Sequence, residues 1–143
     1  MASGIRYDLG LREPEALRAY IREFTGGQLK VAPEHISETV LRLMRKPGPA
    51  ALVAFLRFFK EACGGKEQYV VPYLMSAYPG CTDAHMRELA DWLKARGWRP
   101  QQVQCFIPTP GTVATAMFYC GLDGAGRPIY VARTDAQRLR QHA

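Results

Sequence analysis

Three short apolar runs in this chain each end in a proline-bearing turn, and a helix-like stretch follows each turn. The runs cover residues 29–32, 69–71 and 103–107, and the turns begin at Pro33, Pro72 and Pro108. Strands that alternate with helices usually form a parallel sheet, and such sheets bind ligands at the carboxyl ends of their strands. The turns are therefore where we expect a functional site.

The segments between these runs carry helix signals. A helix is predicted from Pro14, because proline suits the first helical turn, and Gly26 marks its end. Another begins at Thr82 and ends at Gly97, which favours a left-handed cap. Further helices are expected over residues 37–46, 52–63 and 112–119, and from Thr134, where Gln137 completes a capping box.

The strand starts near residues 5, 29, 69 and 103 are separated by about the length of one βα repeat. A closed βα barrel takes about eight strands and about 250 residues, so a chain of 143 residues could form roughly half of one. The predicted fold is therefore α/β, with about four parallel strands alternating with helices in a half, or partial, TIM-like barrel. Residues 112–119 also suit a strand, and residues 128–132 are expected to be extended.

The composition indicates a single globular domain. Hydrophobic residues make up 48% of the chain, and no apolar stretch approaches the roughly 20 residues that a membrane helix needs. The N-terminus has no hydrophobic signal core, so we expect a cytoplasmic protein with no membrane partner. The four cysteines are too far apart for a short-spaced metal chelate, so we expect free thiols and no metal site; they are Cys63, Cys81, Cys105 and Cys120.

The charge leaves a non-enzymatic alternative open. The chain has 19 Lys and Arg against 13 Asp and Glu, a net charge of +6, and the densest basic cluster covers residues 133–140. Such a charge could bind RNA or another anion. The arginines are nevertheless spread along every predicted helix, and no aromatic residues alternate with the basic tail to stack on bases, so a solvated surface is the competing interpretation.

Several short motifs follow one another in a known order. They are SGIRYD at 3–8, KVAPEH at 30–35, MRKPG at 44–48, YPGCT at 78–82 and QCFIPTP at 104–110. Over residues 3–119 the chain thereby resembles the YgiQ-type branch of the radical S-adenosylmethionine (radical SAM) enzymes. It has a looser similarity to the radical SAM methylthiotransferases, which have a Met-x-Arg and a Pro-Gly-x-Thr after successive strands. This chain has Leu43-Met44-Arg45 and Pro79-Gly80-Cys81-Thr82 at those places.

The resemblance implies that residues 4–120 are the C-terminal half of a radical SAM partial barrel, followed at 121–143 by a turn, an extended segment and a basic helix. It also implies that the parent protein uses S-adenosylmethionine and a [4Fe–4S] cluster, which the family holds with a Cys-x3-Cys-x2-Cys motif that this sequence lacks. We therefore expect neither group bound to this piece alone, which should be inactive. Its expected partners are the remainder of its own domain, an unknown substrate, and a second copy of itself.

The same resemblance directs attention to four residues on the turns. S-adenosylmethionine carries a ribose diol and a flat adenine, so Glu34 and His35 are expected to supply polar contacts, Gly80 close backbone approach, and Phe106 an apolar wall. Structural interpretations compete with each role. The acidic side chain of Glu34 could instead stabilise the N-terminus of the next helix. Pro79-Gly80 could simply form a turn, and Phe106 could be a core residue of its strand. Catalytic residues stay unknown.

Overall fold

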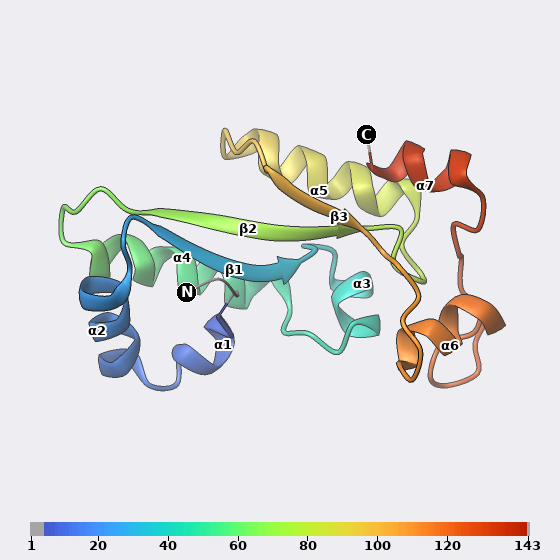
Figure 1. The fold of residues 1–143 in the computed structure, drawn as a ribbon, viewed down its shortest axis with the longest axis horizontal. Coiled ribbons are helices and arrows are strands. Elements are labelled where there is room, and N and C mark those ends of the chain that lie inside the picture. The colour runs from blue at the N-terminus through green and yellow to red at the C-terminus, as the bar shows by residue number, and fades with distance from the viewer. Residues whose placement is uncertain (1–4, 143) are drawn as a thin grey trace.

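The computed structural model describes residues 5–142, which form three parallel strands with helices between them (Figure 1). The strands are β1 (Gln28–Glu34), β2 (Tyr69–Ser76) and β3 (Gln102–Cys105), and they lie side by side in that order. Both pairings are parallel. The predicted α/β class and the parallel sheet are confirmed.

The helices lie where their start and stop signals predicted them. They are α1 (Tyr7–Gly10), α2 (Pro14–Phe24), α3 (Glu38–Leu43), α4 (Pro49–Cys63), α5 (Asp83–Ala95), α6 (Val113–Cys120) and α7 (Asp135–His142), of which only α1 was not expected. The Thr82 hydroxyl accepts the backbone N–H of His85 at the start of α5. The amide oxygen of Gln137 accepts the backbone N–H of Thr134, and the Thr134 hydroxyl accepts that of Gln137, which completes the predicted capping box.

The prediction of a fourth strand near the start of the chain is wrong. Ile5 makes one isolated parallel bridge to Val31, and its N–H donates to the carbonyl of Lys30 at 3.0 Å. The chain then turns into α1, because Tyr7 is buried, with 4% exposure, and its ring packs 5.5 Å from that of Phe55 on α4. Residues 5–142 therefore form a three-stranded sheet and not half of a TIM-like barrel.

Residues 128–132, expected to be extended, lie outside the helices and the three-stranded sheet. Only one antiparallel bridge joins this segment to the preceding turn, between Leu122 and Pro128. The first two strands are longer than predicted, and the turns expected to begin at Pro33 and Pro72 are wrong: Pro33 lies within β1, and Pro72 pairs with Val31 within β2. The third strand is shorter than the predicted residues 103–107, because its ladder ends at Cys105.

The core lies on one face of the sheet. On β1, Leu29 and Val31 are buried against α2 and α4, whose apolar sides contribute Ile21 and Phe55. Each such fully buried side chain stabilises the fold by about 1.5–3 kcal/mol. Figure 1 shows α1, α2 and α4 together beside β1, and α5 with α7 beside β3.

The other face of the sheet carries side chains that are not buried. Successive side chains of a strand point to opposite faces of the sheet. The side chains on this second face are Lys30, Ala32, Val71, Tyr73, Met75, Gln102 and Gln104. The Lys30 ammonium lies 5.9 Å from the centre of the Tyr73 ring. Among the helices of residues 5–142, none is long and apolar enough to cross a membrane.

Candidate functional site

The carboxyl ends of the three strands meet at one edge of the sheet. Ser76 at the end of β2 pairs with Cys105 at the end of β3, and Glu34 at the end of β1 pairs with Leu74. The N–H of Phe106 continues this edge by donating to the Ser76 carbonyl at 2.8 Å. We call the segments that leave this edge, residues 34–37, 77–82 and 106–112, the strand-end rim. It contains all four residues predicted from the sequence.

Glu34 begins the rim in a strained backbone conformation. Its φ is +64°, a left-handed value that is unfavourable for a residue with a side chain. Its carboxylate lies 3.1 Å from the ammonium of Lys46, which also donates to the Ala32 carbonyl at 2.7 Å. The ion pair therefore fixes the Glu34 side chain at the end of β1.

Two further non-glycine residues share this left-handed conformation. Ala77, which follows β2, has a φ of +57°, and Arg45, which follows α3, has a φ of +55°. These three are the described non-glycine residues with positive φ. Strained backbone of this kind persists only where surrounding contacts enforce it, and it concentrates at ligand-binding and active sites.

His35 points away from Glu34 and into the protein. It is 1% exposed; its Nδ1 accepts the N–H of Ser37 at 2.9 Å, and its Nε2 lies 3.7 Å from the Sγ of Cys81. Because Nδ1 accepts, the ring proton sits on Nε2 and faces the sulfur. Burial, with a smaller effect from His85, lowers the pKa of His35 to about 4.

The Cys81 thiol is equally unsuited to nucleophilic chemistry. Burial, and secondarily Asp83, raises its pKa to about 12. A neutral imidazole next to a neutral thiol links the turns after β1 and β2 without activating either group. As expected from their positions on an extended turn, Glu34 and His35 face different partners and do not act as an acid–base pair.

The backbone conformation and the packing around position 80 both require a glycine there. Its φ is +90°, and a Cβ at this position would lie 2.2 Å from the Cδ1 of Leu43. Its N–H donates to the carbonyl of Tyr130 at 2.7 Å. The absence of a side chain thus makes room for Leu43, and the N–H is already bonded within the protein.

An aromatic cluster closes the rim on the β3 side. The ring of Phe106 lies 5.4 Å from that of Tyr78, edge to face, and 6.0 Å from that of Phe118 on α6. Phe106 is 7% exposed, so Tyr78 is the more accessible part of this wall. Burial raises the pKa of Tyr78, with a further contribution from the Glu34 carboxylate.

Sequence reasoning did not select Tyr78 as a wall residue, although its position directly after β2 was a usable signal. Lys46 was also missed. Its partner Glu34 lies on another element, and no spacing rule links the two positions.

A cavity of about 170 Å³ adjoins the rim between α3 and α6. Leu43 and Arg45 line it on one side and Met117 on the other, and the Leu43 carbonyl accepts the Tyr78 hydroxyl at 3.4 Å. Ligand pockets generally hold about 300–1,000 Å³, so this cavity is large enough for part of a cofactor only.

A larger cavity, about 310 Å³, lies between α5 and α7. Its wall consists mainly of apolar side chains of the sheet and of α5, including Leu74, Leu89 and Val103. Its lining includes Gln141, which bonds to the turn after β2, but none of Glu34, Tyr78 and Phe106. It also contains no strained residue, so the rim is the better candidate site.

No metal site is formed by the residues that the structure describes. Within residues 5–142 no group of three His, Cys, Asp or Glu side chains could hold a metal ion, and the four cysteines are free thiols. An iron–sulfur cluster therefore does not fit the side chains of this piece.

The basic tail is engaged with the protein itself. Arg133 donates to the Tyr119 carbonyl at 2.9 Å, Arg138 donates to that of Phe106 at 2.7 Å, and Arg140 lies 2.7 Å from a carboxylate oxygen of Asp83. These contacts weaken the interpretation of the tail as a free nucleic-acid-binding arm.

Several curated proteins similar to this chain are named UPF0313 proteins. A UPF0313 protein of Geobacter sulfurreducens is 51% identical over 146 residues, covering 100% of the chain, and one of Methanosarcina acetivorans is 44% identical over 144 residues, covering 98%. The chain corresponds to one segment of the UPF0313 proteins. It spans 24% and 19% of these two relatives' own length, so it is part of a larger protein. No protein-family model matches the chain.

Proposed function

We propose that the strand-end rim of this chain holds the adenosyl group of S-adenosylmethionine in a larger radical SAM protein. The [4Fe–4S] cluster would be held by residues outside this segment. In such a protein, bound S-adenosylmethionine supplies a 5′-deoxyadenosyl radical. The observation that carries the proposal is the meeting of Glu34, Tyr78 and Phe106 at the carboxyl edge of a parallel sheet.

Each of these residues has a distinct task in the proposal. The carboxylate of Glu34, oriented by Lys46, accepts hydrogen bonds from ribose hydroxyls. Tyr78, backed by Phe106, offers an aromatic surface for adenine. His35 and Gly80 support the rim from within, because the ring of His35 is buried and the N–H of Gly80 is bonded to Tyr130.

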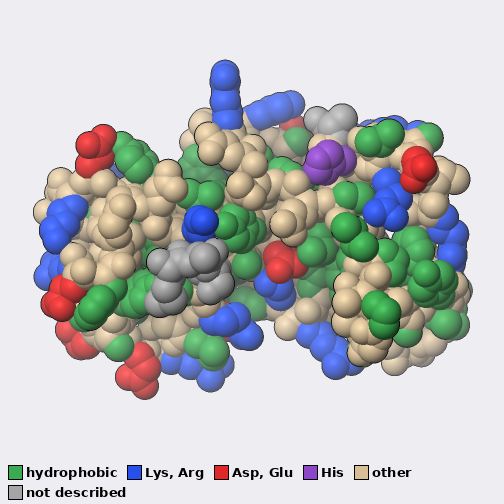
Figure 2. Space-filling model, viewed as in Figure 1, with side chains coloured by type: hydrophobic (Ala, Val, Ile, Leu, Met, Phe, Trp, Pro, Cys, Tyr) green, Lys and Arg blue, Asp and Glu red, His purple; other side chains and the backbone are tan. Residues whose placement is uncertain are grey.

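The surfaces that the rest of the protein would cover are also present. Apart from the Ile5 bridge, the outer edge of β1 has no strand partner among the described residues, and neither has the outer edge of β3. Exposed hydrophobic side chains gather around α6 (Figure 2), including Ile107, Val113 and Tyr119. Unpaired edges and apolar patches favour association, with the remainder of the protein or with a second copy of this chain.

This piece alone is not expected to retain bound S-adenosylmethionine, so the test is an amide-shift titration of the chain, which detects weak contact of added S-adenosylmethionine with the rim. We expect shifts concentrated at Glu34, Tyr78 and Phe106. Glu34→Gln should weaken binding about tenfold or more, because a hydrogen bond to a charged group contributes about 1.5–3 kcal/mol. Glu61→Gln, on the exposed side of α4, is the matched control and should leave the dissociation constant unchanged. Equal binding by both variants would contradict the proposal.

A further inference from the structure

The side chain of Gln141 on α7 is almost fully buried, with 4% exposure, and all of its hydrogen bonds go to the segment that follows β2. Its Oε1 accepts the N–H of Ala77 at 3.0 Å. Its Nε2 donates to the carbonyl of Cys81 at 2.9 Å and to the carboxylate of Asp83 at 3.2 Å. One amide therefore holds both ends of residues 77–83.

The N–H that Gln141 accepts belongs to a strained residue. Ala77 has the left-handed φ of +57°, and it is the first residue of the turn that contains Tyr78 and Gly80. A left-handed alanine persists only if neighbouring groups enforce it. Gln141 is the side chain that bonds to this peptide group from outside the turn.

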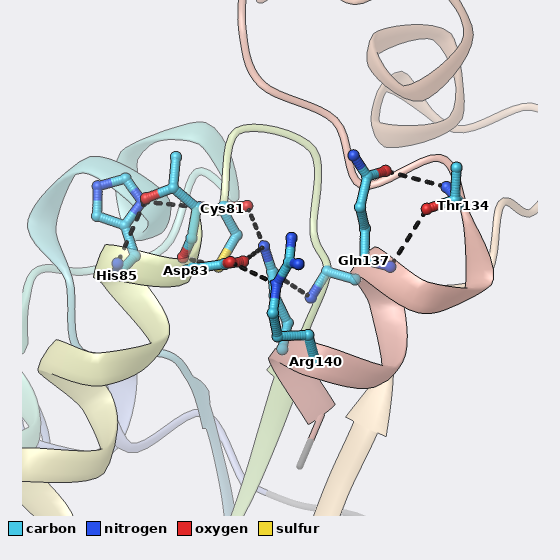
Figure 3. Close-up of polar contacts among 9 residues, drawn as sticks. Cys81, Asp83, His85, Thr134, Gln137 and Arg140 are labelled. Atoms are coloured by element: carbon cyan, nitrogen blue, oxygen red, sulfur yellow. Dashed lines mark hydrogen bonds and ion pairs between the residues drawn. The ribbon is translucent and has the colours of Figure 1, made fainter.

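Other contacts from the C-terminal segment reach the same edge of the molecule. The Tyr130 carbonyl accepts the N–H of Gly80 at 2.7 Å, and Arg138 donates to the Phe106 carbonyl at 2.7 Å. Arg140 pairs with Asp83 at 2.7 Å; Figure 3 shows Arg140 of α7 reaching across to Asp83 at the start of α5. The C-terminal segment thus contacts the turns after both β2 and β3.

We propose that Gln141 is a positioning residue of the strand-end rim: its amide fixes Ala77 and Cys81, and thereby sets the place of Tyr78 between them. The inference rests on the proposed function where it concerns cofactor affinity. The hydrogen-bond geometry of Gln141 stands independently of that function.

The experiment compares Gln141→Leu with the parent chain. Leucine has a similar volume but makes none of the three hydrogen bonds. Gln101→Leu, an exposed position with no side-chain hydrogen bond in the described structure, is the matched control. The first measurement is amide hydrogen exchange of Ala77 and Gly80, with the Leu41 amide of α3, bonded to the Ser37 carbonyl at 2.9 Å, as an internal reference.

We expect Gln141→Leu to speed exchange at Ala77 and Gly80 at least tenfold, with little change at Leu41. The second measurement is the dissociation constant for S-adenosylmethionine at a temperature where both proteins are folded. It should rise at least tenfold in Gln141→Leu and stay unchanged in Gln101→Leu. A residue that only stabilises the fold would lower the unfolding midpoint without changing this constant.

Exchange at Ala77 and Gly80 equal to that of Gln101→Leu would overturn the inference, and so would faster exchange with unaltered affinity. If the parent chain binds no S-adenosylmethionine, the proposed function fails, and amide exchange alone decides the role of Gln141. Should Gln141→Leu not fold, Gln141→Glu replaces it. This variant keeps the acceptor for the Ala77 N–H but places a carboxylate next to that of Asp83. Amide exchange should therefore become faster near Cys81 and Asp83 and stay unchanged at Ala77.

Discussion

Replacing Gly80 with alanine should destabilise the protein by two separable effects. The first is conformational: at a φ of +90° the alanine side chain is strained, which costs about 1–2 kcal/mol. The second is steric. The new Cβ would lie 2.2 Å from the Cδ1 of Leu43, and overpacking of this kind costs about 1–3 kcal/mol. The free energy of unfolding should therefore fall by about 2–5 kcal/mol.

Gly111 provides the matched control for the conformational effect. Its φ is +79°, and a Cβ there would have no atom within 4 Å, so Gly111→Ala should cost only about 1–2 kcal/mol. The difference between the two variants measures the contact with Leu43. In a Leu43→Ala background this difference should vanish, because the obstructing methyl group is gone.

The assay is urea unfolding followed by far-ultraviolet circular dichroism. It compares Gly80→Ala and Gly111→Ala, each with and without Leu43→Ala, at one temperature. If Gly80→Ala costs no more than Gly111→Ala, then Leu43 does not occupy the place that a Cβ would take, and a steric requirement for glycine at position 80 is refuted. Persistence of the difference in the Leu43→Ala background would contradict the same steric requirement.

Three further predictions concern titration, thiol reactivity and nucleic acid. Because the pKa of His35 falls from 6.5 to about 4 on folding, the unfolded chain takes up a proton that the folded chain does not, so stability should fall by up to about 3 kcal/mol as the pH drops from about 6.5 to about 4. His35→Gln should remove this dependence and His142→Gln should keep it, as measured by unfolding at each pH. In the folded protein a thiol reagent should label exposed Cys120 and leave buried Cys81 unmodified, as peptide mapping would show; rapid labelling of Cys81 would contradict its burial. Single-stranded RNA should not bind measurably even at low salt, since the tail arginines are engaged within the chain; binding that weakens steeply with added salt would restore the RNA-binding alternative.

Local signals predicted the helices of this fold well. Thr82, Thr134 and the glycines after α4 and α6 act within one or two turns of the backbone, so their effect can be read from neighbouring residues. Alternation of strands and helices likewise predicted a parallel sheet. The fourth strand failed because Tyr7 gains more by packing on Phe55, a contact between distant positions that no local pattern reports.

The rim was predictable in place but not in detail. Glu34, Gly80 and Phe106 were predicted near strand ends, which the parallel arrangement brings together. The prolines at 33 and 72 did not mark those ends, because both lie within strands. The partners that set the rim's geometry come from elsewhere in the chain: Lys46 to Glu34, Leu43 to Gly80 and Gln141 to Ala77. A lone glutamine on a terminal helix carries no signal that it is buried against a turn some sixty positions away.

The central claim is that the strand-end rim contacts an adenosyl group. The most direct measurement is the set of nuclear Overhauser effects between the adenine protons of S-adenosylmethionine and the side chains of the chain. We expect cross-peaks from adenine to the ring of Tyr78, lost in Tyr78→Ala. Cross-peaks to Trp98, which precedes β3 at the opposite end of the sheet, or no cross-peaks at any concentration, would contradict the claim.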